Sequence, residues 1–206
     1  MLVTDPSKCS HLAAPQILRT HKFISALAYA PTVISTEFVD QCLERDDLLE
    51  PEDFLLQDTS SEKRFKISLP KSLANAKVNA NNLFKGRMIY CVESIHTGTE
   101  VMQSIIEANG GRCIVYRARP GTQLPPRRGE KGPGDAEDDE ADALYLISAT
   151  KKDQVKLWPR FRQLAEGQKW KPRIVKTDWL LDQAMAQELR WQGKYELTEA
   201  DVPAHD

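Results

Sequence analysis

The sequence lacks any long apolar run and any close pair of cysteines, and each absence excludes a class of protein. No segment of its 206 residues approaches the roughly 18 consecutive apolar residues of a membrane span, and no basic region followed by an apolar stretch opens the chain. We therefore expect an intracellular protein with no membrane partner. The four cysteines, Cys9, Cys42, Cys91 and Cys113, include no C-x-x-C pair, and no histidine stands at metal-ligand spacing. We expect four buried, reduced thiols rather than a disulfide or a zinc site.

An excess of charge and the signatures of catalysis are missing as well. The 28 Lys and Arg residues nearly balance the 30 Asp and Glu residues, so the net charge of -2 creates no global attraction to nucleic acid. Nucleotide-binding glycine motifs and the G-x-S-x-G nucleophile motif are absent, and His11 and His96 are isolated. We expect no enzyme and no cofactor, and any recognition of an anion must be local.

What the chain does contain is an internal repeat at an offset of 141 residues. The stretch "TVISTEFVDQCLERDDLLEPEDFLL" (32–56) aligns without gaps over "RIVKTDWLLDQAMAQELRWQGKYEL" (173–197). Each copy reads as a β-branched strand, a capping Thr, an acidic first helical turn and an aromatic residue on the inner face of the helix. The segments before them, "CSHLAAP" (9–15) and "ALYLISA" (143–149), are both predicted strands, each followed by a helix.

The second copy has additional elements in front. A strand is predicted at 83–92, a helix closed by "NGG" at 97–111 and a strand at 112–118, so its order is β-α-β-β-α-β-α. The first copy begins near residue 1 and has no counterpart of the initial strand and helix. Either the sequence is a fragment or shortened gene model, which we favour, or something else completes the first copy.

Two segments differ from the repeats in composition. Residues 59–82 predict a linker with one helix after Pro70, between a first repeat at 1–58 and a second at 83–206. Residues 119–143 are rich in Pro and Gly and then acidic, with little to bury, which predicts a disordered surface insertion in the second repeat.

The motifs "LFKG", "ANGG" and "KTDWLLDQ" in the second copy, and "CSHLAAP", "RTHKF" and "STEFVDQC" in the first, together resemble a tandem pair of BRCT repeats of the DNA damage response. In particular, the chain resembles the C-terminal pair of fungal multi-BRCT genome-maintenance scaffolds, which recognise the damage-phosphorylated tail of a core histone. The resemblance implies an α/β fold of two three-layer repeats, each a four-stranded parallel sheet flanked by helices, with the first repeat lacking its initial strand and helix. It also implies a phosphopeptide in the groove between repeats.

The expected phosphate site lies at the start of the helix in "RTHKF". Thr20 is a plausible N-cap, and Lys22 falls in the first turn, where free N–H groups and the helix dipole favour an anion. By the resemblance, Lys22 and Thr20 bind the phosphate, and Arg19 contacts the peptide beyond it, since a guanidinium suits a carboxylate. Without the resemblance, the same cluster of charges is an ordinary solvated face.

The resemblance suggests further residues around the peptide. Ile24 is a candidate for lining the pocket beyond the phosphate, although it also fits a core position, and His96 and Thr97 correspond to groove positions in the second repeat. Phe38 and Trp179 are expected in the structural core, and no residue is assigned to catalysis or metal binding. The family's other phosphate ligands, a hydroxyl and a glycine amide, belong to the strand that the first copy lacks.

We therefore predict a non-enzymatic, monomeric, nuclear phosphopeptide-binding module whose partner is a phosphorylated nuclear protein or histone tail, recognised at a phosphoserine of SQ type. Two alternatives remain open at this point. One is a phosphate-independent protein scaffold, and the other is binding of a DNA end through the same anion pocket, although the near-neutral charge disfavours direct nucleic-acid binding.

Overall fold

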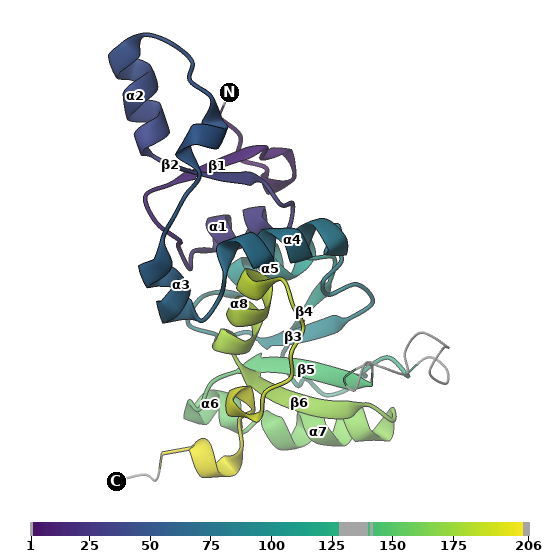
Figure 1. The fold of residues 1–206 in the computed structure, drawn as a ribbon. Coiled ribbons are helices and arrows are strands. Elements are labelled where there is room, and N and C mark those ends of the chain that lie inside the picture. Colours follow the sequence, from purple (N-terminus) through teal and green to yellow (C-terminus); the bar gives the residue numbers. More distant parts are fainter. Residues whose placement is uncertain (1, 128–139, 141, 204–206) are drawn as a thin grey trace. The chain divides into compact units, whose positions relative to one another are not determined.

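The computed structural model describes residues 2–127, 140 and 142–203, and the chain divides into two compact units (Figure 1). The first unit comprises Met1–Lys85, Glu107–Gly110 and Leu181–Leu189, and the second comprises Gly86–Ile106, Gly111–Leu180 and Arg190–Asp206. Helices α5 (Thr99–Ala108) and α8 (Thr177–Ala186) each pass from the second unit into the first.

The first unit contains a parallel pair of strands, β1 (His11–Ala14) and β2 (Thr32–Ser35), with His11 opposite Thr32. The strands are joined by α1 (His21–Leu27), whose residues from Phe23 to Leu27 are all buried. The unit continues with α2 (Glu37–Arg45), α3 (Thr59–Phe65) and α4 (Leu69–Asn79), together with short 3-10 helices at Pro6–Lys8 and Pro51–Phe54.

The second unit is built on a four-stranded, fully parallel sheet in the order β4-β3-β5-β6. The strands are β3 (Met88–Val92), β4 (Arg112–Tyr116), β5 (Ala143–Ser148) and β6 (Lys171–Lys176). All six residues of β5 are buried, as expected of a central strand covered on both faces. Helix α7 (Trp158–Gly167) covers one face (Figure 1), while Trp179 at the start of α8 stacks on Tyr145 on the other, with ring centroids 4.2 Å apart. The remaining elements are α6 (Lys152–Val155) and 3-10 helices at Gly193–Tyr195 and Glu199–Asp201.

The internal repeat is visible in the backbone pairing. Ile34 forms an antiparallel bridge with Leu55, and Val175 forms one with Glu196, so both partners are displaced by 141 residues. The hydrogen bond from Leu56 N to the Val33 carbonyl (3.0 Å) has its counterpart at Leu197 and Ile174 (2.7 Å). The predicted α/β fold with parallel sheets flanked by helices is confirmed.

Several local predictions were wrong. Residues 59–82 form two helices where one was predicted: α4 corresponds to the predicted helix after Pro70, and α3 was not expected. The single helix expected after the predicted strand at 143–149 is divided into α6 and α7. All four cysteines are free thiols, but only Cys91 is buried.

The predicted insertion at 119–143 also differs at its ends. Leu124 is buried, Glu140 is buried against basic side chains, and Ala143 begins β5. Residues 128–139 and 141, which make up most of this segment, lie outside the described residues.

Two core predictions fared differently. Trp179 is buried, with 1% of its surface exposed. Phe38, predicted as its counterpart, is only half-buried, and no other residue of α2 is fully buried either. Its ring contacts Phe54 edge to face, with centroids 5.5 Å apart.

Candidate anion-binding site

The candidate site lies in the first unit, where the loop after β1 enters α1. Thr20 has extended backbone angles, and its hydroxyl accepts a long hydrogen bond from Phe23 N at 3.5 Å, so it is the N-cap as predicted from the sequence. His21 and Lys22 occupy the first turn and are exposed. Within the described part of the chain, the Lys22 ammonium has neither an ion-pair nor a hydrogen-bond partner. The first turn of α1 also contains no acidic residue.

Arg19 is held from the side by Asp182 of α8. One guanidinium nitrogen, Nη2, donates to Asp182 Oδ1 at 2.7 Å, and both side chains are about three-quarters buried, with 27% and 30% exposed. A partly buried, short ion pair fixes the plane of the guanidinium more firmly than an exposed one would. Asp182 therefore holds the Arg19 guanidinium in a fixed orientation.

The loop that carries Arg19 is fastened by Asp58. Its Oδ2 accepts from Ile17 N at 2.9 Å, while Oδ1 accepts from Ser61 N and Ser60 Oγ at 3.0 and 2.7 Å. The hydrogen bonds from Ser61, together with those from Ser60 and Ile17, hold the pKa of the Asp58 carboxyl well below its usual range. Asp58 thus ties the start of α3 to the approach of α1.

Asn75 and Asn79 on α4 hold the end of α8. Their side-chain amides donate to the carbonyl oxygens of Ala186 and Gln187 at 3.1 and 2.8 Å, so they satisfy acceptors that the end of α8 leaves open. The segment that carries Asp182 is thereby held by contacts beyond the Arg19 ion pair.

The predicted site residues do not all fall into this cluster. Arg19, Thr20 and Lys22 are adjacent in space, but Ile24 is 0% exposed and belongs to the core, so the prediction that it lines a peptide pocket was wrong. A helical position two residues from Lys22 faces a different side, which is why Ile24 turns inward. His96 and Thr97 are both exposed in a turn before α5 in the second unit, and their role in peptide binding stays a prediction.

Asp58 and Asp182 were missed as members of the cluster. Asp182 stands within the quoted motif "KTDWLLDQ", but its partner is 163 residues away along the chain. The only local signal was for Asp58, because an acidic residue before "TSSE" is typical of a helix N-cap.

Among the described residues, no group of three or more His, Cys, Asp or Glu is placed to hold a metal ion. No described helix combines the length and the hydropathy that a membrane span requires.

A family model for the BRCA1 C-terminus (BRCT) domain matches residues 79–183, which is half of the chain. The chain belongs to the BRCT family. A second model, for the BRCT domain of the Regulator of Ty1 transposition protein 107, matches residues 1–56. The resemblance seen in the sequence is therefore confirmed in both copies.

Two curated relatives illustrate the range of similarity. BRCT-containing protein 1 of Schizosaccharomyces pombe is 27% identical over 193 residues, covering 91% of this chain and 21% of the relative. Mediator of DNA damage checkpoint protein 1 of Homo sapiens is 29% identical over 118 residues, covering 57% of this chain and 6% of the relative. The chain thus spans about a fifth or less of the length of these relatives.

Solved structures share the fold. The crystal structure of the S. pombe Brc1 BRCT5-BRCT6 domains has a TM-score of 0.69 and 23% identity, covering 98% of this chain and 88% of that one. A complex of Rtt107p with a phosphorylated histone has a TM-score of 0.64 and 20% identity, covering 96% and 79%. The tandem BRCT architecture implied by the resemblance therefore matches known structures over nearly the whole chain.

Proposed function

We propose that this BRCT chain is a phosphopeptide-binding scaffold module of the nuclear DNA damage response, which recognises a phosphoserine of SQ type such as one in a histone tail. Its relatives include a mediator of the DNA damage checkpoint, and one similar structure is a complex with a phosphorylated histone. These similarities support a role in binding rather than catalysis, in the nucleus where such partners lie.

The observation that carries the proposal is the ammonium of Lys22. It is exposed, it lies in the first turn after a capping threonine, and no acidic side chain neutralises it within that turn. Cations at this end of a helix are unfavourable by themselves, because they add to the positive end of the dipole. A bound phosphate offsets this unfavourable interaction, since it accepts a charge-assisted hydrogen bond from the ammonium.

In the proposed site, Arg19 determines on which side of the phosphate the peptide continues. In the proposal, its oriented guanidinium contacts the peptide beyond the phosphate, and Asp182 keeps it in place while that position is empty. A peptide carboxylate then replaces or shares the contact with Asp182. This arrangement favours a ligand with a second negative charge a few residues from the phosphoserine.

The test is a titration of the chain with a fluorescein-labelled peptide containing a phosphoserine-glutamine pair, followed by fluorescence anisotropy. We expect the phosphorylated peptide to bind at least about tenfold more tightly than its unphosphorylated twin. Lys22→Ala should remove about 1.5–3 kcal/mol of binding free energy, roughly a 10- to 100-fold loss, because a hydrogen bond to a charged group is lost.

Lys63→Ala is the matched control, since Lys63 is an exposed lysine on α3 of the same unit, and it should leave binding unchanged. Equal affinity for the two peptides would contradict the phosphate claim and favour a phosphate-independent scaffold. Unchanged affinity of Lys22→Ala would contradict the assignment of the site.

A further inference from the structure

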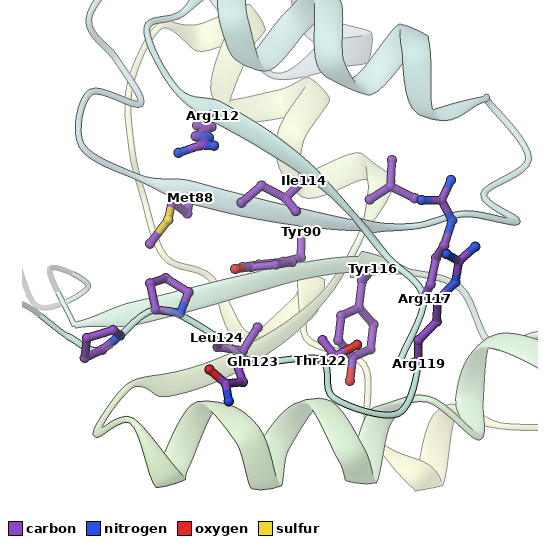
Figure 2. A pocket seen from close by; sticks show the side chains of 13 residues that line it. Met88, Tyr90, Arg112, Ile114, Tyr116, Arg117, Arg119, Thr122, Gln123 and Leu124 are labelled. Atoms are coloured by element: carbon purple, nitrogen blue, oxygen red, sulfur yellow. The ribbon is translucent and has the colours of Figure 1, made fainter.

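We propose that a groove along β4 in the second unit is a second binding site, which takes an extended acidic peptide segment. The groove has a volume of about 580 Å³ and is bounded by β3, β4 and the segment 119–126 (Figure 2). This volume lies within the range of about 300–1,000 Å³ typical of ligand sites. We refer to it as the β4 groove.

The floor of the β4 groove is apolar and rigid. Met88 and Tyr90 of β3 and Ile114 and Tyr116 of β4 project from the same face of the sheet (Figure 2). The rings of Tyr90 and Tyr116 both pack edge to face against Phe161 of α7, at 5.8 and 5.3 Å between centroids. Because each ring contacts the other two, the aromatic floor is fixed before a ligand binds.

The outer wall of the groove is fastened as well. The indole of Trp170 donates to the Pro125 carbonyl at 2.8 Å, and Arg127 N donates to the Gln168 carbonyl at 3.3 Å. Leu124 is buried, with 3% of its surface exposed. The segment that closes the groove is therefore held by described contacts on both its polar and its apolar sides.

One polar atom inside this site has no protein partner. Tyr116 lines the groove, and only 1% of its surface is exposed. Its hydroxyl is buried and makes no hydrogen bond within the described part of the chain. Buried polar groups are nearly always paired, so an unpaired one on the wall of a groove indicates a missing partner. A peptide carbonyl or carboxylate that enters the groove would accept from this hydroxyl.

The rim of the groove carries three arginines. Arg112 lies at one end, and Arg117 and Arg119 lie at the other (Figure 2). Arg117 is paired with Glu93 at 2.6 Å, whereas the guanidinium groups of Arg112 and Arg119 have no ion-pair partner among the described residues. Guanidinium forks are suited to carboxylates, so both ends of the groove favour negative charge.

The spacing of the arginines defines the ligand further. Arg112 begins β4, and the basic end formed by Arg117 and Arg119 starts directly after this strand, so the two basic ends of the groove are separated by roughly 16 Å of strand at about 3.3 Å per residue. An extended peptide that reaches both ends therefore carries acidic residues about five positions apart, with apolar residues between them above the tyrosines. β4 is also an edge strand of the described sheet, where an extended segment can pair through its main chain.

The test uses an eight-residue, fluorescein-labelled peptide with two glutamates at each end and four apolar residues between them. Its comparison is the same peptide with lysines in place of the glutamates. Anisotropy measures the affinities, and NMR amide shifts of the intact chain locate the contact. We expect only the glutamate peptide to bind, with shifts along β4 and the 119–126 segment.

Arg112→Glu and Arg119→Glu should each weaken binding by about tenfold, because each replaces attraction by repulsion. Tyr116→Phe should weaken it by roughly threefold while leaving the chain at least as stable, since the substitution removes an unsatisfied hydroxyl and keeps the ring. Arg45→Glu is the matched control, because Arg45 is an exposed arginine on α2, and binding should not change.

Equal binding of the two peptides, retention of affinity in both arginine variants, or no binding of the glutamate peptide would overturn the proposal. Binding of a single-stranded oligonucleotide that is lost in the same variants, without peptide binding, would also overturn it. Lys22→Ala should leave this binding intact, so failure of the β4 groove and failure of the proposed function can be told apart.

Discussion

Glu140 is the residue on which several basic side chains of the second unit converge. Its carboxylate accepts from Arg173 at 2.7 and 3.0 Å, from Lys171 at 3.3 Å and from the Tyr145 hydroxyl at 3.2 Å. Arg173 is in turn stacked over the ring of Trp191, with 3.9 Å from its central carbon to the ring centroid. Burial alone would raise the pKa of Glu140, but Arg173 and Lys171 outweigh it and lower the pKa.

This cluster makes the free energy of unfolding depend on pH. Because the pKa of Glu140 is lowered by folding, its contribution is present above the ordinary carboxyl value of 4.5 and is lost as the pH falls through the lower folded value. Glu140→Gln should cost roughly 1.5–3 kcal/mol at pH 7, since it removes the charged acceptor of the shorter of the two Arg173 ion pairs and leaves Glu196 as the remaining carboxylate partner of that guanidinium. Urea denaturation at pH 7 and at pH 3 measures the effect, and the variant should approach the parent at the lower pH. An equal difference at both pH values would contradict this assignment.

At the same scale, the sequence alone predicted that Thr20 caps the helix and that a cluster of positive charges lies beside it. Both follow from patterns within a few residues, which local rules describe well. Asp58 and Asp182 could not be assigned to the cluster, because their partners are 41 and 163 residues away. Ile24 was misplaced because the sequence does not reveal how deeply so short a helix is buried.

At the scale of elements, the repeat was the strongest predictor. The repeat matched the sequence of β2 to that of β6 and the sequence of α2 to that of α8, because a fixed offset aligns their apolar positions. The split between α6 and α7 was missed: Pro159 begins a new helix at its first turn and does not disrupt one that is already formed. The second helix of 59–82 was missed because α3 is only seven residues long.

The two copies of the repeat also differ in how deeply their matching helices are buried. Helix α8 buries Trp179, Leu180, Ala184 and Met185, whereas α2 has no fully buried residue and exposes Val39 and Leu43 at 45% and 76%. The half-buried position of Phe38 belongs to this difference. A shared sequence pattern therefore preserved the helix but not its depth in the structure.

The end of α5 depends on a single glycine. Gly110 has a φ of +76°, and a Cβ there would lie 2.6 Å from the carbonyl oxygen of Asn81. Gly110→Ala should destabilise the chain by about 2 kcal/mol or more, because it combines a left-handed conformation with a backbone clash. Thermal and urea unfolding measure this loss.

Gly86→Ala is the comparison for that substitution. Gly86 also has a positive φ, +75°, but a Cβ there meets nothing within 4 Å. Its variant should lose only about 1 kcal/mol, the cost of the conformation itself. Equal losses at the two glycines would show that the contact with Asn81 has no energetic role.

For the whole molecule, the balance of charge limits its partners. With a net charge of -2, the chain should not retard a 30-base-pair duplex at about 0.1 M salt in a gel-shift assay, because no broad positive surface displaces counterions from DNA. The arginines of the β4 groove and Lys22 are local exceptions. Salt-sensitive duplex binding at micromolar protein would contradict this expectation and revive recognition of DNA ends.

The first unit is assembled from three stretches of chain that are far apart in order, and this has a consequence during synthesis. A ribosome releases Arg19 before the second unit, but Leu181–Leu189, with Asp182 and the carbonyls that Asn75 and Asn79 satisfy, emerges only after most of that unit. Domains usually fold from the N-terminus as they emerge. Here the first unit cannot be completed until a segment near the C-terminal end of the sequence has been made. The nascent chain therefore acquires its Arg19–Asp182 ion pair only after the strands of the second unit have been synthesised.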